Sequence, residues 1–288
     1  MREGLGTCRL CVNTRPLRNS HIVPEFLFTH TYSEAHRFRT ITIGDELTQH
    51  TLEICQKGYR EPLLCDECER RLQPWERYTA RLLYGGRSRR GVLTEDGLAT
   101  CEVVGVDYTS LKLFAMSVLW RASVSNLLGF QAVSLGVKHV RRIRSLLLAG
   151  DPGAPDEYGF TVIHLDIGTP YREFRRVLQH PICLKVGSEY AYRFNLAGLY
   201  WIFVVSGHRG ALKDAHQISL HAEGRLKIYD EASSSDRMLL RRQSLLLREG
   251  RWPPWDDDAG GRWPPEPAST DDVARMRREL SGGVLESK

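Results

Sequence analysis

The stretch "LLCDECERRLQPWERYTARLLY", residues 63–84, joins a Cys-x-x-Cys pair to a helical pattern. Leu72, Trp75 and Tyr78 recur at spacings of three, which indicates a helix with one apolar stripe. Pro74 lies inside the pattern, where a proline bends a helix or marks a break. The stretch therefore predicts a helix that begins at a cysteine pair.

A second cysteine pair with the same spacing, "CRLC", lies near the start of the chain. Thiolates two residues apart fit a tight turn that points both sulfurs at one tetrahedral ion, and two such turns complete a closed site. We expect a structural zinc ion that holds the fold, because a closed site has no open coordination position. Unligated cysteines or a redox pair are the alternatives, and neither explains two pairs. The predicted ligands are Cys8, Cys11, Cys65 and Cys68, whereas Cys55, Cys101 and Cys183 are expected to be small buried residues.

The composition is that of a globular protein, with 42% hydrophobic and 26% charged residues over 288 positions. No run approaches about 18 apolar residues, and "MREGLGTCRLC" lacks a secretory apolar block, so we expect no membrane span and a cytoplasmic location. A net charge of +5 permits a polyanionic partner without demanding one. Basic runs such as "KHVRRIR", 138–144, are usually solvated helix faces. No phosphate loop, nucleophile elbow or dinucleotide fingerprint supports a kinase, hydrolase or Rossmann enzyme.

The middle of the chain changes from a helical to a strand pattern. Apolar residues at helical spacing predict a buried helix at about 109–127, and a second helix ends at Gly150. β-branched and aromatic runs separated by glycines predict a small antiparallel sheet at 160–230, and "TITI", 40–43, indicates a short strand.

The end of the chain is rich in Trp, Pro and Asp and repeats "RWPP" at 251 and 262. It is expected to be a disordered linker or an arm that orders on contact, for example against a neighbouring subunit or another protein, because Trp and Arg are favoured interface residues. The expected units are a zinc-stapled domain at 1–84, a basic hinge with the strand leading into the body at 85–104, an α+β body at 105–249, and the arm with a short terminal helix at 250–288.

The segments "SHIVP", 20–24, and "LLCDECE", 63–69, resemble those of zinc-stapled HNH endonucleases. This resemblance implies a ββα-metal fold in which His21 is the general base. A divalent ion, magnesium or manganese, would stabilise the attacked phosphate and the leaving oxygen. It further implies that Ser20 and Glu69 occupy the catalytic metal-ligand positions. A broader similarity, over about residues 8–150, is to poorly characterised bacterial HNH-like proteins.

The sequence departs from the HNH pattern at three positions. Ser20 stands where the family usually has an acidic or imidazole ligand, and its hydroxyl is a weak ligand for a hard cation. Glu69 replaces a His or Asn, and a carboxylate holds magnesium or manganese well. The Asn that orients the base has no counterpart, and Gln56 is the nearest amide. His21 could instead brace the zinc turns by a hydrogen bond to a carbonyl.

The expected fold is therefore α+β, with a zinc-stapled ββα-metal-like head followed by a helical segment and a small antiparallel sheet. The function that the resemblance implies is metal-dependent endonuclease cleavage of nucleic acid, with DNA as the expected substrate, in a role such as bacterial defence. The alternative is a catalytically degenerate HNH-like zinc module that binds nucleic acid or a protein partner. The predicted phosphate contacts are Arg87, Arg89 and Arg90.

Overall fold

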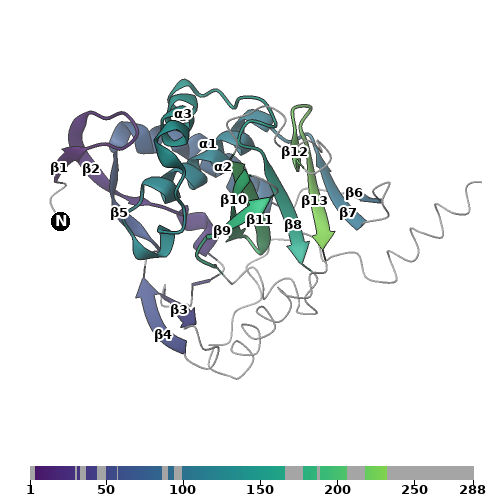
Figure 1. The fold of residues 1–288 in the computed structure, drawn as a ribbon, viewed down its shortest axis with the longest axis horizontal. Helices are drawn as coiled ribbons and strands as arrows, with labels where there is room; N and C mark the ends of the chain where they lie inside the picture. The colour runs from purple at the N-terminus through teal and green to yellow at the C-terminus, as the bar shows by residue number, and fades with distance from the viewer. Residues whose placement is uncertain are drawn as a thin grey trace, which may run out of the picture.

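The computed structural model describes residues 4–29, 31–32, 37–43, 50–56, 58–85, 90–93, 99–165, 178–186, 189–205 and 218–231. Over these residues the chain has a mixed α+β fold with three α-helices and three β-sheets (Figure 1). The predicted arm at 250–288 lies outside the described residues, and the predicted domain boundaries stay predictions.

The first sheet is antiparallel and consists of β1 (Leu5–Thr7), β2 (Thr14–His21) and β5 (Arg60–Cys65). Strand β5 runs directly into helix α1 (Asp66–Tyr84), which packs on β2. The register pairs Leu17 with Cys65, so the beginning of α1 lies beside the middle of β2. Two strands far apart in the sequence and a helix thus form one compact β-β-α unit.

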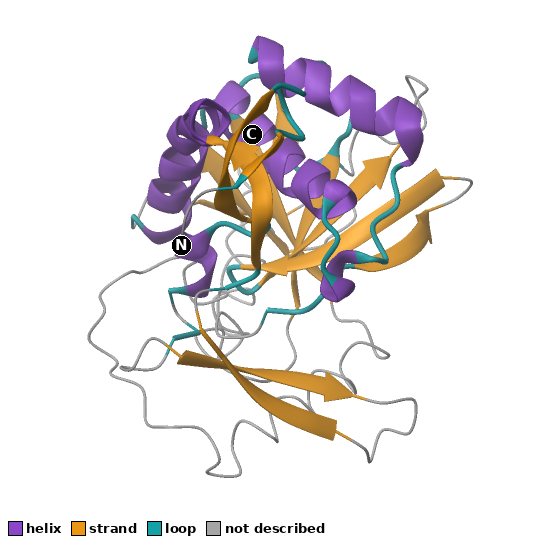
Figure 2. Cartoon of the chain, turned by 90° about the vertical axis from the view of Figure 1, so that its left-hand side faces the viewer, coloured by secondary structure: helices purple, strands orange, loops and turns teal. Residues whose placement is uncertain are grey.

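Helix α1 confirms the helix predicted from residues 63–84, and it continues without interruption past Pro74. Its first turn carries Asp66, Glu67 and Glu69, whose negative charges are favourable at the positive end of the helix dipole. Between β2 and β5 the chain forms a short 3-10 helix, η1 (Glu25–Phe28), and the antiparallel ribbon of β3 (Arg37–Ile43) and β4 (His50–Gln56). The ribbon lies apart from the other strands in both views (Figure 2).

Helix α2 (Tyr108–Val124) is the central element of the fold. It starts at Asp107, whose side chain accepts a hydrogen bond from the Ser110 amide at 3.1 Å. Nearly every side chain from Leu111 to Ala122 is buried, because α1, α3 and the large sheet surround the helix. The Phe114 ring, for example, packs edge-on against Trp201.

Two further helical segments follow α2. The 3-10 helix η2 (Leu128–Phe130) leads to α3 (Gly136–Ala149), which packs against α2. Helix α3 ends at Gly150, whose φ of 68° is a left-handed conformation that glycine adopts at little cost. The helices predicted at about 109–127 and before Gly150 are both confirmed.

The large sheet is bigger than the small antiparallel sheet predicted at 160–230. Two strands that precede α2 in the sequence also belong to this sheet, because one of them pairs with the last described strand, β13. One neighbouring pair of strands, β13 with β8, is parallel. The strand order is β6-β7-β13-β8-β11-β10-β9, and β12 pairs with β13. The strands are β6 (Arg90–Leu93), β7 (Ala99–Val104), β8 (Phe160–Leu165), β9 (Ile182–Val186), β10 (Glu189–Leu196), β11 (Leu199–Val205), β12 (Leu220–His221) and β13 (Arg225–Glu231).

A lysine in α2 is buried against the loop that follows α3. Lys112 is 1% exposed, and its Nζ donates to the carbonyls of Pro155 at 3.0 Å and Ala154 at 3.5 Å. Burial lowers the pKa of Lys112 to about 7, although Glu157 and Asp156 oppose the shift. Of the helices in the described part of the chain, none combines the length and apolar character needed to cross a membrane.

The buried lysine predicts a pH-dependent stability. Between pH 7 and about 10 the unfolded chain protonates Lys112 more fully than the folded chain, so the free energy of unfolding should rise with pH. Relative to Lys112→Met, the wild-type protein is expected to gain about 3 kcal/mol between pH 7 and pH 9.5, measured by urea unfolding. Parallel curves for the two proteins would contradict a depressed pKa.

Candidate functional site

The four predicted cysteine ligands lie together where β1, β2, β5 and α1 meet. Their Sγ atoms all lie within 4.8 Å of one another, and those of Cys11 and Cys65 are 3.8 Å apart. All four are free thiols, and Cys8, Cys65 and Cys68 are buried. This cluster could hold a metal ion, and it is the single group of three or more His, Cys, Asp or Glu ligands found among the described residues.

The backbone favours negative charge on the sulfur of Cys8. The Cys65 amide donates to this sulfur at 3.3 Å. The pKa of Cys8 is lowered, and the largest cause is the hydrogen bond with the Cys68 thiol. The amides of Cys11, Cys65 and Leu10 lower it further, whereas burial acts in the opposite direction. The hydrogen bond between the Cys8 and Cys68 side chains also raises the pKa of Cys68. A thiolate is the form that binds metal, so the surroundings of Cys8 favour a ligand.

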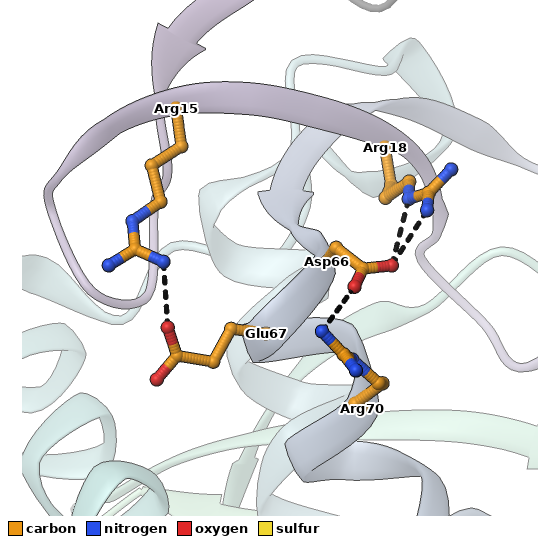
Figure 3. A network of polar contacts seen from close by, with 5 residues as sticks. All are labelled: Arg15, Arg18, Asp66, Glu67 and Arg70. Carbon is orange, nitrogen blue, oxygen red and sulfur yellow. Dashed lines mark hydrogen bonds and ion pairs between the residues drawn. The ribbon is translucent and has the colours of Figure 1, made fainter.

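Ion pairs join β2 to the beginning of α1 (Figure 3). Arg15 contacts Glu67 at 2.7 Å, and Arg18 contacts Asp66 at 2.7 Å. Asp66 also pairs with Arg70 in the next turn of the helix at 2.6 Å. Exposed pairs of this kind add little stability, but they connect the strand that follows the first cysteine pair to the helix that carries Cys68.

Ser20 and Glu69, the two predicted catalytic metal ligands, lie next to each other. The Ser20 side chain is buried and its Oγ accepts the Leu64 amide at 3.0 Å. Burial is the main cause that raises the pKa of Glu69, while a hydrogen bond from Ser20 and the charge of Arg121 act in the opposite direction. Glu69 Oε1 is buried and has no hydrogen-bond partner among the described atoms.

His21, the predicted general base, ends β2 at the edge of this site. Its side chain is 18% exposed, and its Nε2 lies 3.7 Å from Oε2 of Glu25. Glu25 in turn pairs with Arg60 at 3.1 Å. The imidazole therefore lies beside a carboxylate of η1.

Sequence reasoning missed Arg121, which α2 inserts between β2 and α1. Its side chain is 1% exposed, and its Nη1 donates to the His21 carbonyl at 2.9 Å. Its Nη2 lies 2.8 Å from Glu76 Oε1, an ion pair outside hydrogen-bond geometry, and its Nε donates to the Ser117 carbonyl. The one signal in the sequence is a charged residue inside the apolar run "LFAMSVLWRASVS". We call Ser20, His21, Glu69, Glu76, Ser117 and Arg121 the Arg121 cluster.

The cation of the Arg121 cluster is the Arg121 guanidinium itself. The guanidinium contacts both β2 and α1 and attracts the Glu69 carboxylate. A divalent ion placed at Glu69 would be repelled by this buried positive charge, and an interior of low dielectric strengthens such a repulsion. The cluster is therefore better suited to joining α2 to the β-β-α unit than to holding a second metal ion.

The other predicted site residues are only partly described. Arg87 and Arg89 lie outside the described residues, and Arg90 and Gln56 are described by their backbone alone, in β6 and β4. The prediction that Cys183 is buried is wrong: Cys183 is exposed, because β9 is an edge strand of the large sheet, and Cys101 is half-buried.

Comparisons of the chain with protein-family models, with curated proteins and with solved structures found no match.

Replacing Arg121 is expected to destabilise the fold strongly. Arg121→Met leaves the carboxylates of Glu76 and Glu69 without their cation, and the free energy of unfolding should fall by about 2–4 kcal/mol in urea titrations. The control is Arg142→Met, which breaks the more exposed pair with Glu157 and should cost under about 1 kcal/mol. Equal losses in the two variants would contradict a special role for Arg121.

Proposed function

We propose that residues 1–84 form a zinc-stapled HNH-like module that binds nucleic acid, and that Arg121 has replaced the catalytic metal ion. The order of β2, β5 and α1 supports the ββα-like arrangement, since two antiparallel strands lead directly into the helix that packs on them. Ser20 ends up on the strand and Glu69 on the helix, facing each other as the HNH resemblance implies.

Zinc is the proposed occupant of the cysteine cluster. Tetrahedral coordination with Zn–S bonds of about 2.3 Å separates the sulfurs by about 3.8 Å, and the sulfurs of Cys11 and Cys65 are 3.8 Å apart. A disulfide would need sulfurs about 2.05 Å apart. Four thiolates around one ion form a closed site, so the role of this zinc is to hold β2, β5 and α1 together.

The buried guanidinium of Arg121 carries the proposal that the module is not catalytic. An HNH-type mechanism needs a divalent ion between the strand and the helix. Arg121 reaches this space from α2, bonds to the His21 carbonyl and pairs with Glu76. Ser20 Oγ is also engaged, because it accepts the Leu64 amide. The net charge of +5 supports a polyanionic partner, for which we propose nucleic acid, DNA in the first place.

The second candidate is an active endonuclease, and the surroundings of His21 favour it. Glu25 lies 3.7 Å from His21 Nε2, and a neighbouring carboxylate orients an imidazole. In this reading His21 activates water, and Glu69 holds magnesium or manganese with help from Ser20. A role in bacterial defence would accompany cleavage.

A binding and nicking assay separates the two candidates. The purified full chain is expected to retard a DNA duplex in a gel, and to leave a supercoiled plasmid intact in magnesium, manganese or EDTA. Nicking that requires a metal and disappears in His21→Ala, with its zinc retained, would establish the second candidate instead. Failure to retard either DNA or RNA would contradict the first.

Removal of zinc is expected to unfold the β-β-α unit. One zinc per chain should be found by elemental mass spectrometry, and a strong chelator should lower the melting temperature, because ligand binding to the folded state alone stabilises it. Cys11→Ser is expected to lose the metal, whereas Cys183→Ser, at an exposed position in β9, should keep it. Full zinc content in Cys11→Ser would contradict the four-sulfur site.

A further inference from the structure

An open groove of about 590 Å³ lies beside the cysteine cluster. One wall is the turn between β1 and β2, including Cys8 and Arg9, and the other is formed by the end of α2 and the first turns of α3. The groove is separate from the Arg121 cluster, none of whose residues lines it. Neither the proposed zinc site nor the proposed HNH resemblance accounts for it.

The groove is positively charged. Arg9, Arg141 and Arg144 line it, and none of the described residues in its lining is an Asp or a Glu. No carboxylate in the described part of the chain pairs with any of the three arginines. Three like charges along one groove, with no paired carboxylate among the described residues, raise the local concentration of an anionic ligand.

The arginines of the basic run "KHVRRIR" lie on two different faces of α3. Arg141 and Arg144 are three residues apart and therefore lie on one face of α3, the face that lines the groove. Arg142 is on another face, where its Nε pairs with Glu157 at 2.7 Å. Arg141 and Arg142 are both exposed, as expected for a solvated basic run.

Among the described residues, the lining combines polar and charged side chains with apolar ones such as Val12 and Val137, and it offers no ring on which a base could stack. Hydroxyl and amide side chains, such as those of Ser125, Ser134 and Gln131, lie among the arginines. The one aromatic residue in the lining, Phe130, is 2% exposed and offers no free ring face. Contacts of this type hold the sugar-phosphate backbone and carry no sequence information.

We propose that this groove binds the phosphodiester backbone of a nucleic acid, with Arg9, Arg141 and Arg144 as phosphate contacts. The inference rests on the proposed nucleic-acid-binding function and gives that function a surface. It also places phosphate contacts on α3 and on the turn between β1 and β2, in addition to Arg87, Arg89 and Arg90, which are expected from the sequence.

The salt dependence of DNA binding tests the groove. For B-form DNA the logarithm of the affinity falls with the logarithm of the salt concentration, with a slope of about −0.9 for each neutralised phosphate. Fluorescence anisotropy with a labelled DNA duplex of arbitrary sequence, at several KCl concentrations, measures this slope. Arg141→Gln and Arg144→Gln should each weaken binding roughly five- to tenfold near 0.1 M salt and flatten the slope by about 0.9.

Arg142→Gln is the matched control, since it removes the same charge from the same helix but from the side that pairs with Glu157. It should leave the slope unchanged and alter the affinity less than twofold. Zinc content and melting temperature, measured for every variant, establish that each is folded. Arg9→Gln examines the opposite wall and should act like Arg141→Gln.

The outcomes separate this inference from the proposed function. Binding by the wild-type protein with the same slope in Arg9→Gln, Arg141→Gln, Arg144→Gln and Arg142→Gln would overturn the groove and leave nucleic-acid binding intact. No binding of DNA or RNA by the wild-type protein would overturn both. Polyglutamate that binds in place of nucleic acid, and is lost in Arg141→Gln, would assign the groove to an acidic protein and overturn the inference.

Discussion

The fold depends on one buried positive charge. The Arg121 guanidinium, 1% exposed, connects the carbonyl at the end of β2 to a carboxylate on α1, while its own helix packs against the large sheet. Burying such a charge is costly unless its hydrogen bonds and its counter-charge are supplied. Here Ser117, His21 and Glu76 supply them, so α2 has one favourable position relative to the β-β-α unit.

The same interaction changes how the HNH-like residues are understood. Considered alone, His21 and Glu69 suggest a hydrolytic centre with weak substitutes around it. With Arg121 between the strand and the helix, the polar groups become mutual partners: a carbonyl, two carboxylates, a serine and a guanidinium. The network is only partly satisfied, since Oε1 of Glu69 and Oε1 of Glu76 accept no hydrogen bond from the described residues.

Local patterns in the sequence predicted local structure well, and long-range pairing poorly. The apolar stripe of α1, the buried run of α2 and Gly150 after α3 each act over a few residues, and all three helices are confirmed. The convergence of Cys8, Cys11, Cys65 and Cys68 was also predictable, since the pair spacing identifies the ligands. The pairing of β7 with β13, and Arg121 with Glu76, joins distant segments, and no short pattern carries that information.

The path of the chain between β2 and β5 determines how readily the length of this segment can change. A metal ion that fixes the cysteine turns closes a long loop, which includes η1 and the β3–β4 ribbon. The entropy of loop closure grows only with the logarithm of loop length, by about 0.6 kcal/mol for each doubling. A change in the length of this excursion that leaves its buried residues, such as Phe28 and Phe38, in place therefore costs little, and it leaves the four-sulfur centre unchanged.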